Sequence, residues 1–134
     1  MPRTITVEVD QVGPSTSKGT ARSHNVVIDR PADKGGEDRG PLGGELLLLS
    51  LGGCFMSTLL AAIKTREADV SGVKLSVAGT IGGVPERFES LHMRVSAKHN
   101  DADLMRKLML MAERGCLVTN TLRDAVIITL ELVS

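Results

Sequence analysis

The chain has 134 residues, enough for one domain with a substantial core, and 42% of them are hydrophobic. Sixteen basic residues balance sixteen acidic ones, and Phe55 and Phe88 are the only aromatic side chains. The sequence lacks both a basic excess and aromatic stacking platforms, so we expect no nucleic-acid partner.

The N-terminal part of the chain predicts short strands joined by turns. Residues 4–10 alternate apolar and polar side chains, which is typical of an amphipathic strand. Residues 11–19 have turn composition, and residues 20–30 predict one or two further strands. Residues 31–44 are polar and glycine-rich and predict a loop.

Residues 41–66 predict a helix of about twenty residues, with Pro41 at its start and Lys64 or Arg66 at its C-terminal end. Residues 46–63 carry no charged side chain, and this length reaches the threshold for a membrane span. Glycine, serine and threonine interrupt the apolar run, however, and the segments on both sides read as amphipathic strands. We therefore expect a helix at the centre of a soluble fold or of a dimer, and no membrane partner.

The cellular location follows from the thiols and the N-terminus. Two cysteines are too few for the disulfide framework of a secreted protein. The first residues are too polar and alternate too early to form a signal peptide. We expect a cytoplasmic protein with reduced thiols.

The second half of the chain predicts a hairpin and a helix. Residues 73–80 and 91–97 alternate apolar and polar side chains and predict an antiparallel strand pair. Residues 103–115 have apolar side chains at helical spacing, and Asp101 or Asp103 provides the N-cap.

A short helix or turn over residues 118–124 and a closing strand over residues 125–133 complete the chain. That strand is apolar on most of both faces, so we expect it to be buried or covered. The order of strands and helices indicates a single α+β domain over residues 1–134.

Cys54 lies in the middle of the apolar helix, directly after Gly52 and Gly53. Each glycine weakens a helix by roughly 1 kcal/mol relative to alanine, so the pair indicates close approach of another backbone or of a substrate. A close helix crossing with a buried, inert cysteine explains the same residues. A reactive Cys54 must be a thiolate, and because it is far from the helix N-terminus it needs a cation from elsewhere, preferably an arginine.

Two segments resemble the OsmC/Ohr family of osmotically induced and organic-hydroperoxide-resistance proteins. They are GPLGGELLLLSLGGC, residues 40–54, and ERGCLVTNTLRDAVIITLEL, residues 113–132; residues 82–95 between them look like the family's strand pair. The resemblance implies an OsmC-like α+β fold with antiparallel sheets around two central helices. It also implies an intertwined homodimer with its active site at the subunit interface.

The resemblance further implies a thiol-dependent peroxidase that reduces organic hydroperoxides as part of an antioxidant stress response. Cys54 would be the peroxidatic cysteine, and Cys116 would resolve its sulfenic acid as an intramolecular disulfide. An external dithiol reductant, such as a lipoyl protein, would reopen that disulfide. No metal or organic cofactor is implied, and the histidines lack the spacing of zinc ligands.

The glutamate of the family pattern is displaced in this chain. The hydroperoxidase pattern has it ten residues before the cysteine, where this sequence has Gly44, whereas Glu45 lies nine residues before Cys54. Nine residues turn a side chain to the opposite face of a continuous helix, so a catalytic Glu45 requires an irregular helix start. An acidic residue that stabilises the first helical turn is the other interpretation of Glu45.

The activating arginine that the resemblance implies is assigned to Arg22, with Arg39 and Arg87 as alternatives. The displaced glutamate and the two glycines leave a second hypothesis open. In it, the protein is a non-enzymatic OsmC-like dimer that binds a small apolar ligand, and its cysteines are merely buried.

Overall fold

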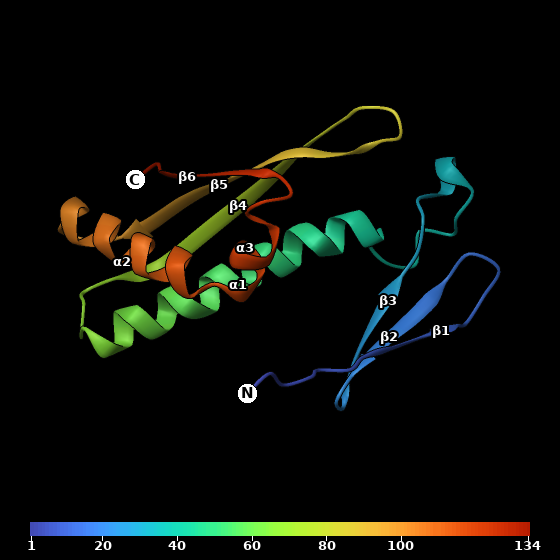
Figure 1. The fold of residues 1–134 in the computed structure, drawn as a ribbon, viewed down its shortest axis with the longest axis horizontal. Coiled ribbons are helices and arrows are strands. Elements are labelled where there is room, and N and C mark those ends of the chain that lie inside the picture. Colours follow the sequence, from blue (N-terminus) through green and yellow to red (C-terminus); the bar gives the residue numbers. More distant parts are fainter. The chain divides into compact units, whose positions relative to one another are not determined.

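A computed structural model describes residues 1–134 and divides them into two compact units, Met1–Leu47 and Leu48–Ser134. The elements of the first unit are labelled in Figure 1 and are β1 (Glu8–Gln11), β2 (Ser17–Ala21), β3 (His24–Ile28) and the 3-10 turn η1 (Ala32–Lys34). The helix α1 (Gly43–Thr65) begins in the first unit and continues in the second. The remaining elements of the second unit are β4 (Ser71–Gly82), β5 (Arg87–Lys98), α2 (Ala102–Gly115), α3 (Leu117–Leu122) and β6 (Ile127–Leu132).

The first unit is built on an antiparallel sheet in the order β1-β2-β3. Val9 pairs with Gly19, which pairs with Val26, so the apolar side chains share one face of the sheet. Val9 and Val26 remain 63% and 41% exposed. The first strand is shorter than predicted, because pairing begins at Glu8.

The carboxylate of Asp29 connects the end of β3 to the loop that follows it through hydrogen bonds. The Thr16 hydroxyl donates to its carboxylate at 2.8 Å, and the backbone N–H groups of Arg30 and Arg39 donate at 2.7 and 3.2 Å. Burial alone would raise the pKa of Asp29, but these hydrogen bonds lower it to about 2. The carboxylate therefore stays charged although the residue is only 2% exposed.

The second unit contains a three-stranded sheet in the order β4-β5-β6. The antiparallel pairing of β4 with β5 confirms the predicted hairpin. β6, in contrast, pairs with β5 in parallel, so the expectation of purely antiparallel sheets is wrong here. The physical reason is the connection: α2 and α3 carry the chain back across the sheet before β6 begins, as a parallel pair requires.

The observed burial of β6 also differs from the predicted burial. Its side chains alternate between partly buried and exposed positions, and Ile127 is 68% exposed. β6 is an edge strand with only one face against the core, and the expectation that both faces are covered is therefore wrong within this chain.

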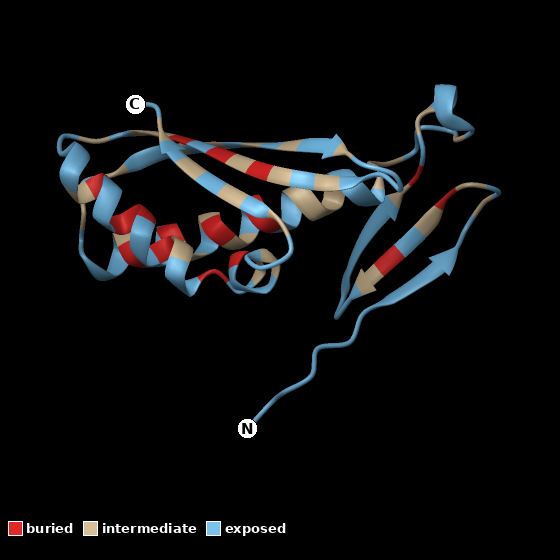
Figure 2. Cartoon of the chain, turned by 45° about the horizontal axis from the view of Figure 1, so that its top comes forward, coloured by how far each residue is buried: buried red, intermediate tan, exposed pale blue.

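The core of the second unit lies between one face of the sheet and the two longer helices. Figure 2 shows its buried positions on α1, α2 and the central strand β5. Of the two predicted caps, Asp101 rather than Asp103 caps α2, through a hydrogen bond from the backbone N–H of Leu104 at 3.0 Å. The most deeply buried apolar side chains of the core are Leu51, Phe55, Leu59, Leu91, Met93, Val95, Met105 and Leu108.

The helix α1 confirms the predicted apolar helix, although Pro41 lies before its first residue rather than within it. α1 is long and apolar enough to span a membrane by length and composition alone. Such a helix is weak support for a membrane protein, because the core helix of a soluble domain meets the same criteria.

Candidate functional site

The structure brings Cys54 and Cys116 together. Cys54 lies on α1, half-buried against the core, and Cys116 is fully buried at the junction of α2 and α3. Both thiols are free, and Cys54 is close enough to act on the pKa of Cys116 by hydrogen bonding and by charge. Two cysteines that lie 62 positions apart in the sequence thus form one pair of neighbouring thiols.

A hydrogen bond between the two helices supports this arrangement. Thr58, one turn after Cys54, donates its hydroxyl to the carbonyl oxygen of Ala112 at 3.0 Å. Ala112 lies one turn before Cys116 at the end of α2. At Gly115 an added Cβ would be 3.9 Å from the Thr58 methyl group, so the end of α2 lies directly against this part of α1.

Cys116 is held at the start of α3 as its N-cap. Its backbone is extended (φ −81°, ψ 111°), and the backbone N–H of Thr119 donates to its sulfur at 3.4 Å. Burial raises the pKa of the Cys116 thiol, hydrogen bonding from Thr119 opposes this rise, and Cys54 adds to it. The direction of the shift keeps Cys116 in the thiol form while the pair is reduced.

The two glycines before Cys54 have different surroundings. An added Cβ at Gly52 would lie 3.0 Å from Val77 and 3.4 Å from Leu75, so this glycine lets α1 pack closely on β4. At Gly53 no atom lies within 4 Å of an added Cβ. Gly52 therefore allows close approach of a strand rather than of a substrate, while Gly53 leaves open space beside Cys54.

Glu45 caps the start of α1. Its carboxylate accepts a hydrogen bond from the backbone N–H of Leu42 at 2.8 Å, the geometry of the second half of a capping box. α1 runs without interruption from Gly43, so there is no irregular start that would return Glu45 to the face of Cys54. Its position matches the interpretation of a first-turn residue, and its catalytic role stays a prediction.

The three candidate arginines have different surroundings, and none of them is shown to reach Cys54. Arg22 is exposed in the turn between β2 and β3, in the left-handed region with φ of 56°. Arg39 donates its backbone N–H to Asp29, and Arg87 donates from its guanidinium to the carbonyl oxygen of Ala125. Arg22 belongs to the unit Met1–Leu47, and its role at Cys54 stays a prediction.

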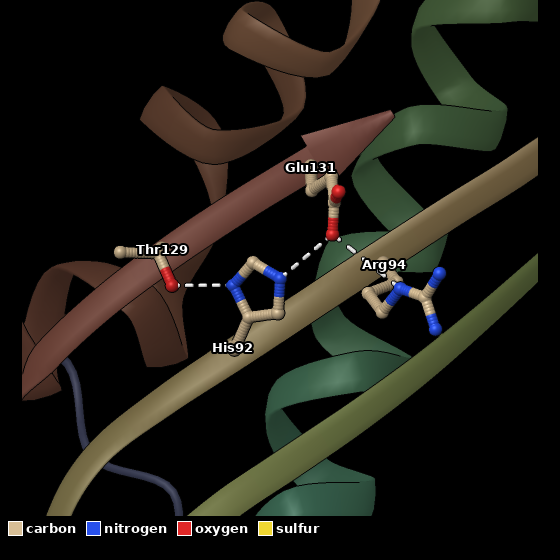
Figure 3. A network of polar contacts seen from close by, with 4 residues as sticks. All are labelled: His92, Arg94, Thr129 and Glu131. Atoms are coloured by element: carbon tan, nitrogen blue, oxygen red, sulfur yellow. Dashed lines mark hydrogen bonds and ion pairs between the residues drawn. The ribbon is translucent and has the colours of Figure 1, made fainter. Parts of the chain in front are cut away.

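A polar network covers part of the sheet face opposite the core (Figure 3). His92 contacts Thr129 through Nδ1 and Glu131 through Nε2, the latter at 3.0 Å, and Arg94 approaches the same Glu131 oxygen at 3.4 Å. The hydrogen bond from His92 lowers the pKa of Glu131, and Arg94 adds to this effect. The network links β5 to β6, and sequence reasoning did not identify it because its residues pair across a parallel register.

Neither this network nor the cysteine pair forms a metal centre: no group of three or more His, Cys, Asp or Glu side chains is placed to hold a metal ion.

Sequence reasoning also missed the position of Thr119 beside Cys116. The available signal is the spacing, because an N-cap residue accepts a hydrogen bond from the backbone N–H three positions later.

Comparison with known proteins identifies the family. Residues 35–131 match the family model of the OsmC-like proteins, and no curated protein sequence matches. An OsmC-like protein of unknown function from Vibrio cholerae has a similar structure, with a TM-score of 0.84 at 10% identity, covering 98% of this chain and 100% of that chain.

Two structures of similar fold are organic hydroperoxide resistance proteins. The OsmC protein of Legionella pneumophila has a TM-score of 0.76 at 16% identity and covers 98% of both chains. The OhrB protein of Bacillus subtilis has a TM-score of 0.70 at 19% identity, again covering 98% of both chains. At these identities the likeness supports the fold alone.

The family model covers well over half of the chain, including both cysteines. The OsmC-like fold is that of a soluble domain, which makes α1 a core helix rather than a membrane span. The α+β architecture with two sheets agrees with this assignment. The chain therefore belongs to the OsmC-like protein family.

Proposed function

We propose that this protein is a thiol-dependent peroxidase that reduces organic hydroperoxides through Cys54 and Cys116. The observation that carries the proposal is the pair of free, neighbouring thiols on α1 and at the start of α3. Membership of the OsmC-like family and the organic hydroperoxide resistance proteins among the similar structures support a peroxidase role in a stress response.

The different burial of the two thiols supports different roles for them. Cys54 is half-buried and borders the open space at Gly53, whereas Cys116 is fully buried. A hydroperoxide therefore reaches Cys54 first, and Cys116 is placed to react only with Cys54. This matches a peroxidatic Cys54 and a resolving Cys116.

The reaction proceeds in three balanced steps. The Cys54 thiolate attacks the hydroperoxide, the O–O bond breaks, one oxygen stays on sulfur as a sulfenic acid, and the departing alkoxide takes up a proton from water to leave as an alcohol. The Cys116 sulfur then attacks the Cys54 sulfur, the S–S bond forms, the S–O bond breaks and water leaves. An external dithiol such as a lipoyl group reduces the disulfide and becomes a disulfide itself.

Activation of Cys54 is the part of the proposal that needs a cation. We assign it to Arg22, since a guanidinium stays charged at all working pH values. Replacing Arg22 with methionine retains bulk and removes the charge. The rate of Cys54 alkylation at neutral pH should then fall in a Cys116→Ser background, and an unchanged rate would exclude Arg22 as the activating residue.

We further propose that the protein works as a cytoplasmic, intertwined homodimer. Apolar side chains lie exposed on α1, where Leu49 is 62% and Leu60 is 49% exposed, and on the β1–β3 sheet, where Val9 is 63% exposed. A second copy of the chain would cover these exposed apolar faces and bury them in a large dimer interface. Sedimentation should show a dimer at micromolar concentration, and a well-folded monomer would contradict the proposal.

A turnover assay tests the proposed activity. The protein is mixed with cumene hydroperoxide and excess dihydrolipoamide, and loss of the hydroperoxide is followed. Cys54→Ser should abolish catalysis, whereas Cys116→Ser, the matched control, should still allow one reaction at Cys54. If Cys54→Ser consumes hydroperoxide as fast as the parent, the peroxidase proposal fails and the binding of a small apolar ligand becomes the better hypothesis.

A further inference from the structure

Thr119 has an unexplained hydroxyl next to the cysteine pair. The residue is fully buried, and its Oγ1 makes no hydrogen bond of regular geometry, although the hydroxyl lies near enough to the Cys116 sulfur to lower the pKa of that thiol. Thr121, two residues later in the same short helix, donates its own hydroxyl to the Leu117 carbonyl oxygen at 2.8 Å. A buried hydroxyl without a partner is costly, so its retention at position 119 calls for a state of the protein in which it is used.

The position of Thr119 indicates what that state is. Its backbone N–H already donates to the Cys116 sulfur at 3.4 Å, which fixes the residue beside this thiol. A neutral thiol is a weak hydrogen-bond acceptor and does not require a second donor, whereas a thiolate accepts strongly. The free hydroxyl therefore matches the charged form of Cys116 rather than the reduced thiol.

We propose that Thr119 is the positioning residue for the resolving step, with its hydroxyl turning to donate to the Cys116 thiolate as that sulfur attacks Cys54. The inference rests on the peroxidase function proposed above. It explains how a sulfur that burial disfavours as an anion can react at all. Of the groups that act on the pKa of Cys116, burial and Cys54 raise it, and Thr119 is the one that lowers it.

The chemical role is confined to one step. Cys116 loses its proton, its thiolate forms the S–S bond with the Cys54 sulfenic acid, and the departing hydroxide takes up a proton to leave as water. Thr119 gains and loses no atom in this step. Its hydroxyl stabilises the negative charge on sulfur before the bond forms and is released when the disulfide has closed.

Two substitutions separate the hydroxyl from the bulk of the side chain. Thr119→Val keeps the shape and removes the hydroxyl, whereas Thr119→Ser keeps the hydroxyl and removes the methyl group. In a Cys54→Ser background, which needs no hydroperoxide, thiolate absorbance against pH reads the ionisation of Cys116 directly. We expect Thr119→Val to move the midpoint to higher pH and Thr119→Ser to leave it near that of the parent.

The second readout is the lifetime of the Cys54 sulfenic acid, followed by trapping with dimedone after a single addition of hydroperoxide. Thr119→Val should close the disulfide about tenfold more slowly, the loss expected for one hydrogen bond to a charged group, and Thr119→Ser should restore the rate. Thr119→Ala gives the same test if valine is not accommodated.

The outcomes separate this inference from the proposed function. If absorbance midpoints agree among all variants, or if serine shifts the midpoint as much as valine, the role of Thr119 is wrong even where hydroperoxide is consumed. If no sulfenic acid forms in any variant, the peroxidase proposal fails, and the absorbance titration still decides whether Thr119 stabilises the Cys116 thiolate.

Discussion

Removing the Thr58 hydroxyl should weaken both the fold and the cysteine pair. Thr58→Val keeps the size and branching of the side chain and removes its bond to the Ala112 carbonyl oxygen, which measures 3.0 Å. Ala112 is 1% exposed, so water does not replace the lost donor. The loss of one buried hydrogen bond lowers the free energy of unfolding by about 1–2 kcal/mol.

Urea unfolding of the reduced protein measures this change, and Thr58→Ser, which retains the hydroxyl, is the matched control. The single hydroxyl proton of Thr58 is shared among the carbonyl oxygens of Ala112, Phe55 and Cys54. Phe55 and Cys54 belong to the same helix as Thr58, so the loss of the contact with α2 should dominate. Closure of the Cys54–Cys116 disulfide by a thiol oxidant should also be slower in Thr58→Val. Equal stability and equal closure rates for the valine and serine variants would refute the role of this bond.

Three further predictions follow from the packing, the buried carboxylate and the helix cap. Gly79→Ala would place a Cβ 2.6 Å from the Phe88 ring and should cost about 1–3 kcal/mol in urea unfolding, with Phe88→Leu relieving the loss in the double variant. The pKa of Asp29 is lowered from 3.8 to about 2, so its stabilisation is complete above about pH 4 and is lost as the pH falls towards 2. Asp29→Asn should therefore flatten the acid-induced drop in the urea midpoint over this range, and an unchanged profile would contradict this. Glu45→Gln keeps an acceptor for the Leu42 N–H and should retain both stability and turnover, whereas a tenfold loss of turnover would support a catalytic role for Glu45.

Much of the fold could be predicted from the sequence because its signals are local. Alternation over residues 73–80 and 91–97 and a cap at Asp101 or Asp103 depend on neighbouring residues, and the structure confirms the hairpin and the helix α2. The parallel pairing of β6 could not be predicted from its own apolar pattern. Strand direction is set by the path of the chain through α2 and α3, which no local pattern records.

The sequence predicted the two cysteines of the site but not the contacts that hold them in place. The two cysteine motifs identified Cys54 and Cys116, and the structure shows their thiols as neighbours. The contacts that hold them there, from Thr58 to Ala112 and from Thr119 to Cys116, join residues of ordinary type whose role depends on how helices pack. Gly52 shows the same limit, because a glycine before a cysteine indicates close approach but not which partner approaches.

The central claim is that Cys54 and Cys116 form a redox pair that a hydroperoxide oxidises. One equivalent of cumene hydroperoxide is added to the fully reduced protein without a reductant, and free thiols and intact mass are measured. We expect loss of both thiols, a mass lower by two hydrogens and a cross-linked peptide that contains Cys54 and Cys116. Survival of both thiols while the hydroperoxide remains unconsumed would contradict it.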